Sequence, residues 1–236
     1  MKEVYIHAWR LFSQNFLKLL IITLVVWIPC ELAVSWLIAT FYSADNTLAP
    51  MKLERLANNF FGIIAIAASN YIFREKEENG HASLGGAFGA GFLYWGWMFA
   101  TRFLVGLATV VGLILLILPG LYICIRLVLC EAIIVAENTW GIECCQRSME
   151  LTKGKFWRVL LWLLGGCGPA VVAAFLCYLP FVFVDNIGWQ LDALGSVLSD
   201  IPMIFIYPIF WAIYTKLRDE HDGTTHLPVI TPTSSL

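Results

Sequence analysis

The sequence predicts an all-α fold, a polytopic membrane bundle of about six transmembrane helices with an additional amphipathic helix at the membrane interface. Two observations lead to this fold class. First, 59% of the 236 residues are hydrophobic and 14% are charged, whereas soluble domains have about 45–50% apolar and about 25% charged residues. Second, the apolar residues form runs close to the roughly 20 residues that a membrane helix needs. These runs leave no room for a separate soluble catalytic domain.

The first apolar run follows a short mixed segment. Residues 2–15 have apolar positions at helical spacing together with Lys2 and Arg10, which predicts a short interfacial helix. The first span then covers about 16–41 and contains Glu31. This run is longer than the apolar region of a signal peptide, so we interpret it as a membrane span.

Polar segments and turns separate the remaining spans. Residues 43–55 are expected to form an outer loop, 74–86 an inner loop, and Pro119-Gly120 a tight helical hairpin. The predicted spans are about 16–41, 56–73, 97–118, 121–136, 156–184 and 194–214, all within a single membrane domain of residues 1–218. Residues 219–236 are polar and are expected to be a disordered cytoplasmic tail.

The segment between the fourth and fifth spans is amphipathic. Within residues 138–153, apolar and polar side chains fall on opposite faces of a helix. Glu143 and Arg147 have the i,i+4 spacing and order that favour an ion pair, and Gly154 can end the helix. We therefore expect a helix that lies on the membrane surface.

Lysine and arginine residues indicate the orientation of the bundle. The segments on the side of the two termini contain most of them, and the opposite side contains only Lys52 and Arg55. Positively charged loops stay in the cytoplasm, so both termini are predicted to be cytoplasmic.

The seven cysteines indicate free thiols, because their number is odd and most lie within apolar runs. The adjacent Cys144 and Cys145 are the only ones expected to be accessible to solvent. His221 and His226 lie in the tail without a second cluster of ligands, so no metal site and no cofactor are predicted.

Two stretches resemble a known family. They are LPGLYICIRLVLCEAIIVAE (118–137) and CCQRSMELTKGKFWRVL (144–160), and the N-terminal AWRLFSQNFLKLL is also similar. The pattern is a Pro-Gly turn, an arginine in the next span, an acidic end and an Arg-Ser, Leu-x-x-Gly, Trp-Arg run. Its positions here are Pro119, Gly120, Arg126, Glu137, Arg147, Ser148, Leu151, Gly154, Trp157 and Arg158.

The pattern resembles a largely uncharacterised family of bacterial integral membrane proteins, related to the membrane domain of some glycerophosphoryl diester phosphodiesterases. The resemblance implies a six-helix fold in the cell inner membrane. It does not imply phosphodiesterase activity, because in the fused enzymes a separate barrel domain carries out the hydrolysis. This chain has no such domain and no His-Arg catalytic pair.

Four charged residues lie inside the predicted spans, namely Glu31, Arg102, Arg126 and Glu131. Charges in lipid are costly and normally face the bundle interior or a wet cavity. Counted from the hairpin turn, Arg102 and Glu131 differ in depth by about six residues, or ~9 Å at helical rise, and a long arginine side chain can cover much of that. Arg126 lies nearer the outer face, where it can meet Glu31. Either these residues form a polar pocket for an ion or an anionic head group, or they are structural ion pairs. The residues favour the second interpretation.

Gly165, Gly166, Gly168 and Pro169 weaken the centre of the fifth span. A helix break here would free backbone groups to coordinate a substrate, as in many transporters. Close helix packing around a kink is the alternative that we favour.

Arg147, Lys153, Lys155 and Arg158 form a basic group before and at the start of the fifth span. They suit contact with anionic lipid at the cytoplasmic surface. Ordinary positive-inside topology accounts for the same residues, and both interpretations stay open.

We expect a non-enzymatic multi-pass membrane protein, a scaffold or accessory module that engages lipids or partner membrane proteins. Its expected partners are membrane lipids, other membrane proteins or further copies of itself, and not nucleic acid. The alternative is a small transporter or lipid carrier with a polar intramembrane pocket. An embedded enzyme is the weakest hypothesis, because the sequence lacks the usual catalytic motifs and its histidines lie outside the spans.

Overall fold

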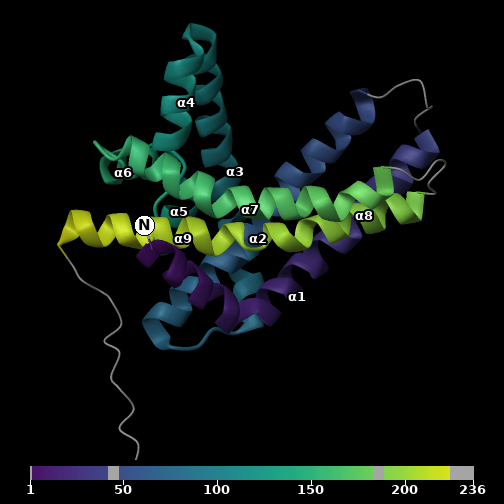
Figure 1. Ribbon diagram of the computed structural model, residues 1–236, viewed down its shortest axis with the longest axis horizontal. Coiled ribbons are helices and arrows are strands. Elements are labelled where there is room, and N and C mark those ends of the chain that lie inside the picture. Colours follow the sequence, from purple (N-terminus) through teal and green to yellow (C-terminus); the bar gives the residue numbers. More distant parts are fainter. Residues whose placement is uncertain (1, 42–47, 183–188, 224–236) are drawn as a thin grey trace, which may run out of the picture.

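The described part of the chain is entirely helical. The computed structural model describes residues 2–41, 48–182 and 189–223. Their helices are α1 (Lys2–Phe41), α2 (Leu48–Asn79), α3 (Leu84–Leu115), α4 (Ile117–Arg126), α5 (Cys130–Glu137), α6 (Gly141–Leu151), α7 (Phe156–Val182), α8 (Trp189–Met203) and α9 (Ile206–Asp222) (Figure 1). This confirms the all-α class for these residues.

The helices form a body from which one hairpin projects. Helices α8 and α9 follow one another along α7, and both also pack against α1, while α3 and α4 form an antiparallel hairpin that points away from them (Figure 1). The short helix α5 lies in the body, where Ile133, Ile134 and Val135 are fully buried. It packs against α2 and α9, the helices that carry the buried Phe73 and Trp211.

Five helical segments of the described chain are long and apolar enough to cross a membrane. They are Lys2–Phe41, Leu84–Ile114, Leu118–Glu137, Phe156–Phe181 and Ala193–Asp222. Many of their large apolar side chains are exposed, as Ile114 and Phe175 illustrate. Exposed apolar surface on this scale suits a lipid environment, so the architecture is that of a multi-pass membrane protein. Helix α2, which contains the predicted span 56–73, is not among the five.

The first helix differs from the prediction of a separate interfacial helix at residues 2–15. Helix α1 is continuous from Lys2 to Phe41, and its 40 residues would extend about 60 Å, twice a hydrocarbon core of about 30 Å. Val4, Ala8 and Leu11 are buried against the rest of the protein. The apolar stripe of this segment therefore packs on other helices and not on the headgroup layer.

The inner and outer loops are shorter than predicted. Helix α2 begins at Leu48 and continues to Asn79, so it takes up parts of the predicted loops 43–55 and 74–86. The part of the outer loop at 43–47 lies outside the described residues. Ser83 caps α3 because its side chain accepts a hydrogen bond from the backbone N–H of Gly86 at 3.1 Å.

The hairpin turn lies slightly before the predicted Pro119-Gly120 position. The break is at Leu116, which is extended between α3 and α4. Pro119 lies in the first turn of α4. Backbone N–H groups in the first turn of a helix have no helical acceptor, so a proline there costs no hydrogen bond. Gly112 and Gly120 let the two helices meet closely, because a Cβ on Gly112 would lie 2.9 Å from the Cα of Gly120.

The predicted fourth and sixth spans are each interrupted. Helix α4 ends at Arg126 and α5 begins at Cys130, whereas the prediction was one span over 121–136. Helices α8 and α9 are separated by a turn at 204–205, close to Pro202 and Pro208. Helix α9 also corrects the prediction that residues 219–236 form a disordered tail, because residues 219–222 are helical. The rest of that segment from residue 224 onward lies outside the described residues.

The described part of the predicted fifth span, residues 156–182, contains no break. Helix α7 runs through Gly165, Gly166, Gly168 and Pro169 without interruption. A Cβ on Gly165 would collide with the hydroxyl of Tyr5 in α1, and one on Gly166 would lie 2.8 Å from Ile209 in α9. These glycines therefore allow three helices to pack closely.

Adding a side chain at Gly166 is expected to weaken this packing. Overpacking of a tight contact typically costs about 1–3 kcal/mol, so Gly166→Leu should lower the thermal unfolding midpoint of the detergent-purified protein. Gly168→Leu is the matched control, because a Cβ at Gly168 meets nothing within 4 Å. Equal midpoints for the two variants would contradict the close approach of α7 and α9.

Candidate functional site

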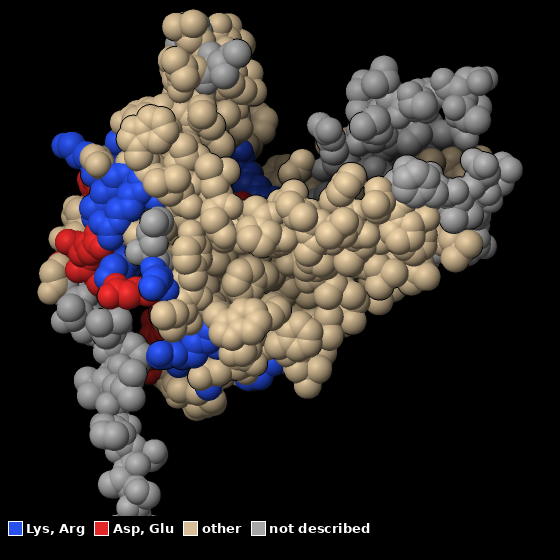
Figure 2. All heavy atoms as spheres, in the orientation of Figure 1, with Lys and Arg blue, Asp and Glu red and all other residues tan. Residues whose placement is uncertain are grey.

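The charged residues gather at one end of the molecule. On the face shown in Figure 2, lysine, arginine, aspartate and glutamate lie mainly around α6, the start of α1 and the end of α9, and the described part of the projecting α3–α4 hairpin shows no charged side chain beyond its base. Trp9 and Trp157 are exposed and lie next to Arg10 and Arg158 in the chain. Tryptophan beside basic residues is typical of a membrane–water interface.

Arg102 and Glu131 form the ion pair that the sequence predicts within the spans. The Nε of Arg102 lies 2.5 Å from Oε1 of Glu131, which joins α3 to α5. Asn70 of α2 donates a hydrogen bond to the backbone carbonyl of Glu131 at 3.1 Å. The two charged side chains keep 28% and 35% of their surface exposed. The pair thus links three helices and also faces outward.

Arg126 does not join this pair among the described contacts. Its guanidinium donates to the Tyr122 hydroxyl at 2.7 Å and to the Met149 carbonyl at 2.5 Å. Its own carbonyl, which the end of α4 leaves without a helical partner, accepts a hydrogen bond from Ser148 Oγ at 2.7 Å. Arg126 therefore fastens the end of α4 to α6. The other predicted pocket residue, Glu31, is buried in α1.

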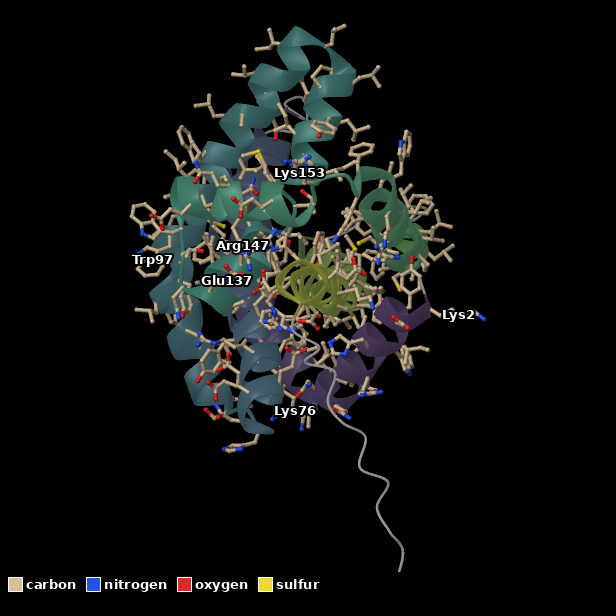
Figure 3. All side chains as sticks on the ribbon, turned by 90° about the vertical axis from the view of Figure 1, so that its left-hand side faces the viewer. Lys2, Lys76, Trp97, Glu137, Arg147 and Lys153 are labelled. Atoms are coloured by element: carbon tan, nitrogen blue, oxygen red, sulfur yellow. The ribbon has the colours of Figure 1, made fainter. Side chains whose placement is uncertain are left out.

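Arg147 connects α5, α6 and α9. Its Nε lies 3.1 Å from Glu137 Oε2 and its Nη2 lies 2.6 Å from Asp222 Oδ2. The Tyr214 hydroxyl donates to Glu137 Oε1 at 3.0 Å. Figure 3 looks onto this end and shows Glu137 and Arg147 near its centre. The predicted Glu143–Arg147 pair is absent from the ion pairs of the described residues, because tertiary partners engage the guanidinium instead.

The start of α7 is held to α9 in the same way. The Glu220 carboxylate accepts hydrogen bonds from Nη1 and Nη2 of Arg158, and its Oε2 lies 3.1 Å from Lys155 Nζ. The guanidinium of Arg158 also stacks over the Trp162 ring, 4.4 Å from its centroid. Of the four basic residues predicted to contact lipid, only Lys153 makes no ion pair within the described chain. The sequence did not indicate these partners, because Glu220 and Asp222 were assigned to a disordered tail.

Cys144 and Cys145 are buried, which corrects the prediction that they are accessible. Cys144 Sγ donates to the carbonyl of Cys130 at 3.2 Å. A hydrogen bond with Cys130, together with burial, raises the pKa of the Cys145 thiol far above its ordinary value. This thiol therefore stays protonated and unreactive. The described residues contain no cluster of three or more potential metal ligands.

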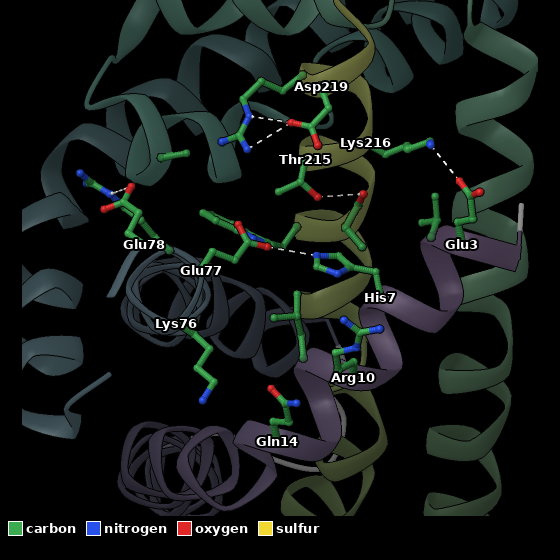
Figure 4. Close-up of a pocket in the computed structure, with 17 residues that line it drawn as sticks. Glu3, His7, Arg10, Gln14, Lys76, Glu77, Glu78, Thr215, Lys216 and Asp219 are labelled. Atoms are coloured by element: carbon green, nitrogen blue, oxygen red, sulfur yellow. Dashed lines mark hydrogen bonds and ion pairs between the residues drawn. The ribbon is translucent and has the colours of Figure 1, made fainter. Parts of the chain in front are cut away.

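A charged cavity of about 730 Å³ opens at the polar end (Figure 4). Helices α1, α2 and α9 supply most of its wall, and Ala136 of α5 completes it. Sequence reasoning did not find this cavity. Its residues are spread from Glu3 to Asp219, and no local motif marks them.

The cavity lining carries five lysine or arginine residues and four carboxylates. All four carboxylates are engaged. Their contacts are Lys216–Glu3 at 2.8 Å, His7–Glu77 at 3.1 Å, Arg74–Glu78 at 3.0 Å and Arg218–Asp219 at 3.3 Å. Arg10 and Lys76 have no carboxylate partner among the described residues, and Lys76 donates to the Gly80 carbonyl at 2.9 Å. The cavity therefore offers cationic groups to a ligand.

Comparisons of the chain with protein-family models, with curated proteins and with solved structures find no match in any of the three. The chemistry of the polar end and of the intramembrane pair therefore carries the functional argument.

Proposed function

We propose that the protein is a non-enzymatic, multi-pass inner-membrane protein that acts as a scaffold or accessory module and engages lipids or partner membrane proteins. The separation of charge from apolar surface carries this proposal. The long apolar helices, with their many exposed apolar side chains, suit the hydrocarbon core, and the polar end suits the cytoplasmic surface and its headgroups.

The proposed topology has six spans with both termini in the cytoplasm, and α2 supplies the additional crossing. The positive-inside distribution of lysine and arginine supports this orientation. The amphipathic helix α6 would lie at the cytoplasmic surface, where Lys153 is available to anionic lipid. The family resemblance of the central stretch supports the inner membrane as the location.

The main test is native mass spectrometry of mildly extracted protein. We expect co-purifying anionic lipid or a stoichiometric protein partner, and retention of the chain in membranes after an alkaline wash. Lys153→Gln should reduce any enriched anionic lipid, and Lys2→Gln is a charge-matched control. Turnover of a lipid substrate by the purified protein, lost in Arg126→Ala, would refute the non-enzymatic proposal.

A small transporter or lipid carrier is the second candidate. The observation that favours it is the partial exposure of Arg102 and Glu131, since an outward-facing ion pair in a membrane span needs a polar neighbour. Flux from proteoliposomes that disappears in Glu131→Gln, while the folded yield is unchanged, would favour the carrier. A loss of folded protein instead would assign the pair to helix packing.

A further inference from the structure

The lining of the cavity at the polar end has five lysine or arginine residues and four carboxylates, and two of these cations have no carboxylate partner in the described chain. We propose that the cavity binds the phosphate group of an amphipathic ligand, and that Arg10 and Lys76 are the cations that recognise it. This inference deepens the proposed engagement of lipids. It rests on the proposed function in only one respect, the position of the cavity at the membrane surface.

The ion pairs of the cavity lining determine which of its cations are available to bind an anion. Lys216, Arg74 and Arg218 each have a carboxylate partner within 3.3 Å, so binding through them would require an existing pair to break. Arg10 has no such partner in the described structure, and Lys76 is held by a carbonyl alone. These two side chains can therefore bind an anion at the lowest cost.

Their arrangement suits phosphate. In Figure 4, Arg10 and Gln14 of α1 and Lys76 of α2 lie on the same side of the cavity, below the His7–Glu77 contact. An arginine fork can bind two oxygens of one phosphate. Lysine adds a point charge, and the amide of Gln14 adds a neutral donor. The proposed phosphate would therefore be contacted by donors of both α1 and α2.

The rest of the wall indicates that the ligand is larger than phosphate itself. Val4, Leu11, Trp211 and Ala212 form the apolar base of the cavity, with at most 4% of each residue's surface exposed. The volume of about 730 Å³ is in the range of sites that hold small organic molecules. A phosphate joined to an apolar group would use both parts of the cavity. Its source is either an anionic phospholipid headgroup or a soluble organic phosphate.

The test uses the full-length protein in two settings. Inorganic phosphate is titrated against protein in a zwitterionic detergent, and thermal stabilisation is compared with that in chloride of equal ionic strength. In parallel, nanodiscs of phosphatidylcholine with or without phosphatidic acid are analysed by native mass spectrometry. Stabilisation by free phosphate indicates a soluble source, and retention of phosphatidic acid alone indicates a lipid source. Either result supports the site.

The variants connect binding to the cavity. Loss of a charge-assisted contact in Arg10→Gln should weaken phosphate or phosphatidic acid binding about tenfold or more, and Lys76→Gln should weaken it as well. Lys2→Gln removes the same charge from the same helix outside the lining and should bind like the unmodified protein. Because Arg10 has no described ion pair, its variant should fold normally, which its melting midpoint without ligand will verify.

Absence of any preference for phosphate or phosphatidic acid would overturn the site, as would unchanged binding in Arg10→Gln. Retention in alkaline-washed membranes separates this failure from failure of the proposed function. A chain that stays in the membrane but binds no phosphate refutes the cavity assignment alone. A chain released from the membrane refutes the proposed membrane function itself.

Discussion

Replacing Glu131 with alanine is expected to produce the largest loss of stability of any single change proposed here. The substitution would leave Arg102 charged and without its carboxylate partner in an otherwise apolar region. Removing one member of a buried ion pair costs about 3–5 kcal/mol, and the partial exposure of this pair reduces our expectation to about 2–3 kcal/mol. The measurement is the folded yield and thermal unfolding midpoint in detergent.

Two further variants make this prediction specific. The double variant Arg102→Leu/Glu131→Leu removes both charges, so it should recover much of the stability lost by Glu131→Ala. Glu143→Ala removes an exposed glutamate that has no ion pair in the described structure, and it should have little effect. If the double variant is less stable than Glu131→Ala, the unpaired charge is not the cause.

Gly112→Leu is expected to open the α3–α4 hairpin. The Cβ of the new side chain would lie 2.9 Å from the Cα of Gly120, and backbone cannot rotate away as a flexible side chain can. Close approach of backbones at small residues is a main source of helix association in membranes, and overpacking typically costs about 1–3 kcal/mol. The variant should show faster proteolysis at the hairpin and a lower unfolding midpoint.

Gly106→Leu is the matched control for this experiment. It lies in the same helix, but a Cβ there meets nothing within 4 Å. Its higher helix propensity should leave stability unchanged or slightly increased. Equal protease sensitivity in the two variants would show that the hairpin does not depend on the Gly112–Gly120 contact.

The intramembrane pair shows why part of the site could be predicted from sequence. A charge in an apolar run is costly unless it finds a partner. The predicted hairpin placed Arg102 and Glu131 about six residues, or ~9 Å, apart in depth, much of which a long arginine side chain can cover. The same reasoning was wrong for the i,i+4 pair of Glu143 and Arg147. Arg147 has closer tertiary partners in Glu137 and Asp222, which a local pattern cannot include.

The cavity illustrates the opposite case. His7 and Glu77 are 70 residues apart in the chain, and Lys216 reaches Glu3 across almost the full length of the sequence. Each of these residues resembles an ordinary solvated charge when considered alone. Only the packing of α1, α2 and α9 leaves Arg10 and Lys76 available beside an apolar wall.

By itself, the sequence determined that the chain is helical, that its long apolar runs suit a membrane and that its polar segments lie between them. These properties depend on hydropathy summed over neighbouring residues, so a local pattern contains them. Only the tertiary structure determined that α4 ends before α5 begins and that α7 continues through its glycines. It also determined which basic residues have carboxylate partners. Those outcomes depend on hydrogen bonds, ion pairs and backbone contacts between distant segments, whose energies exist only once the helices have packed.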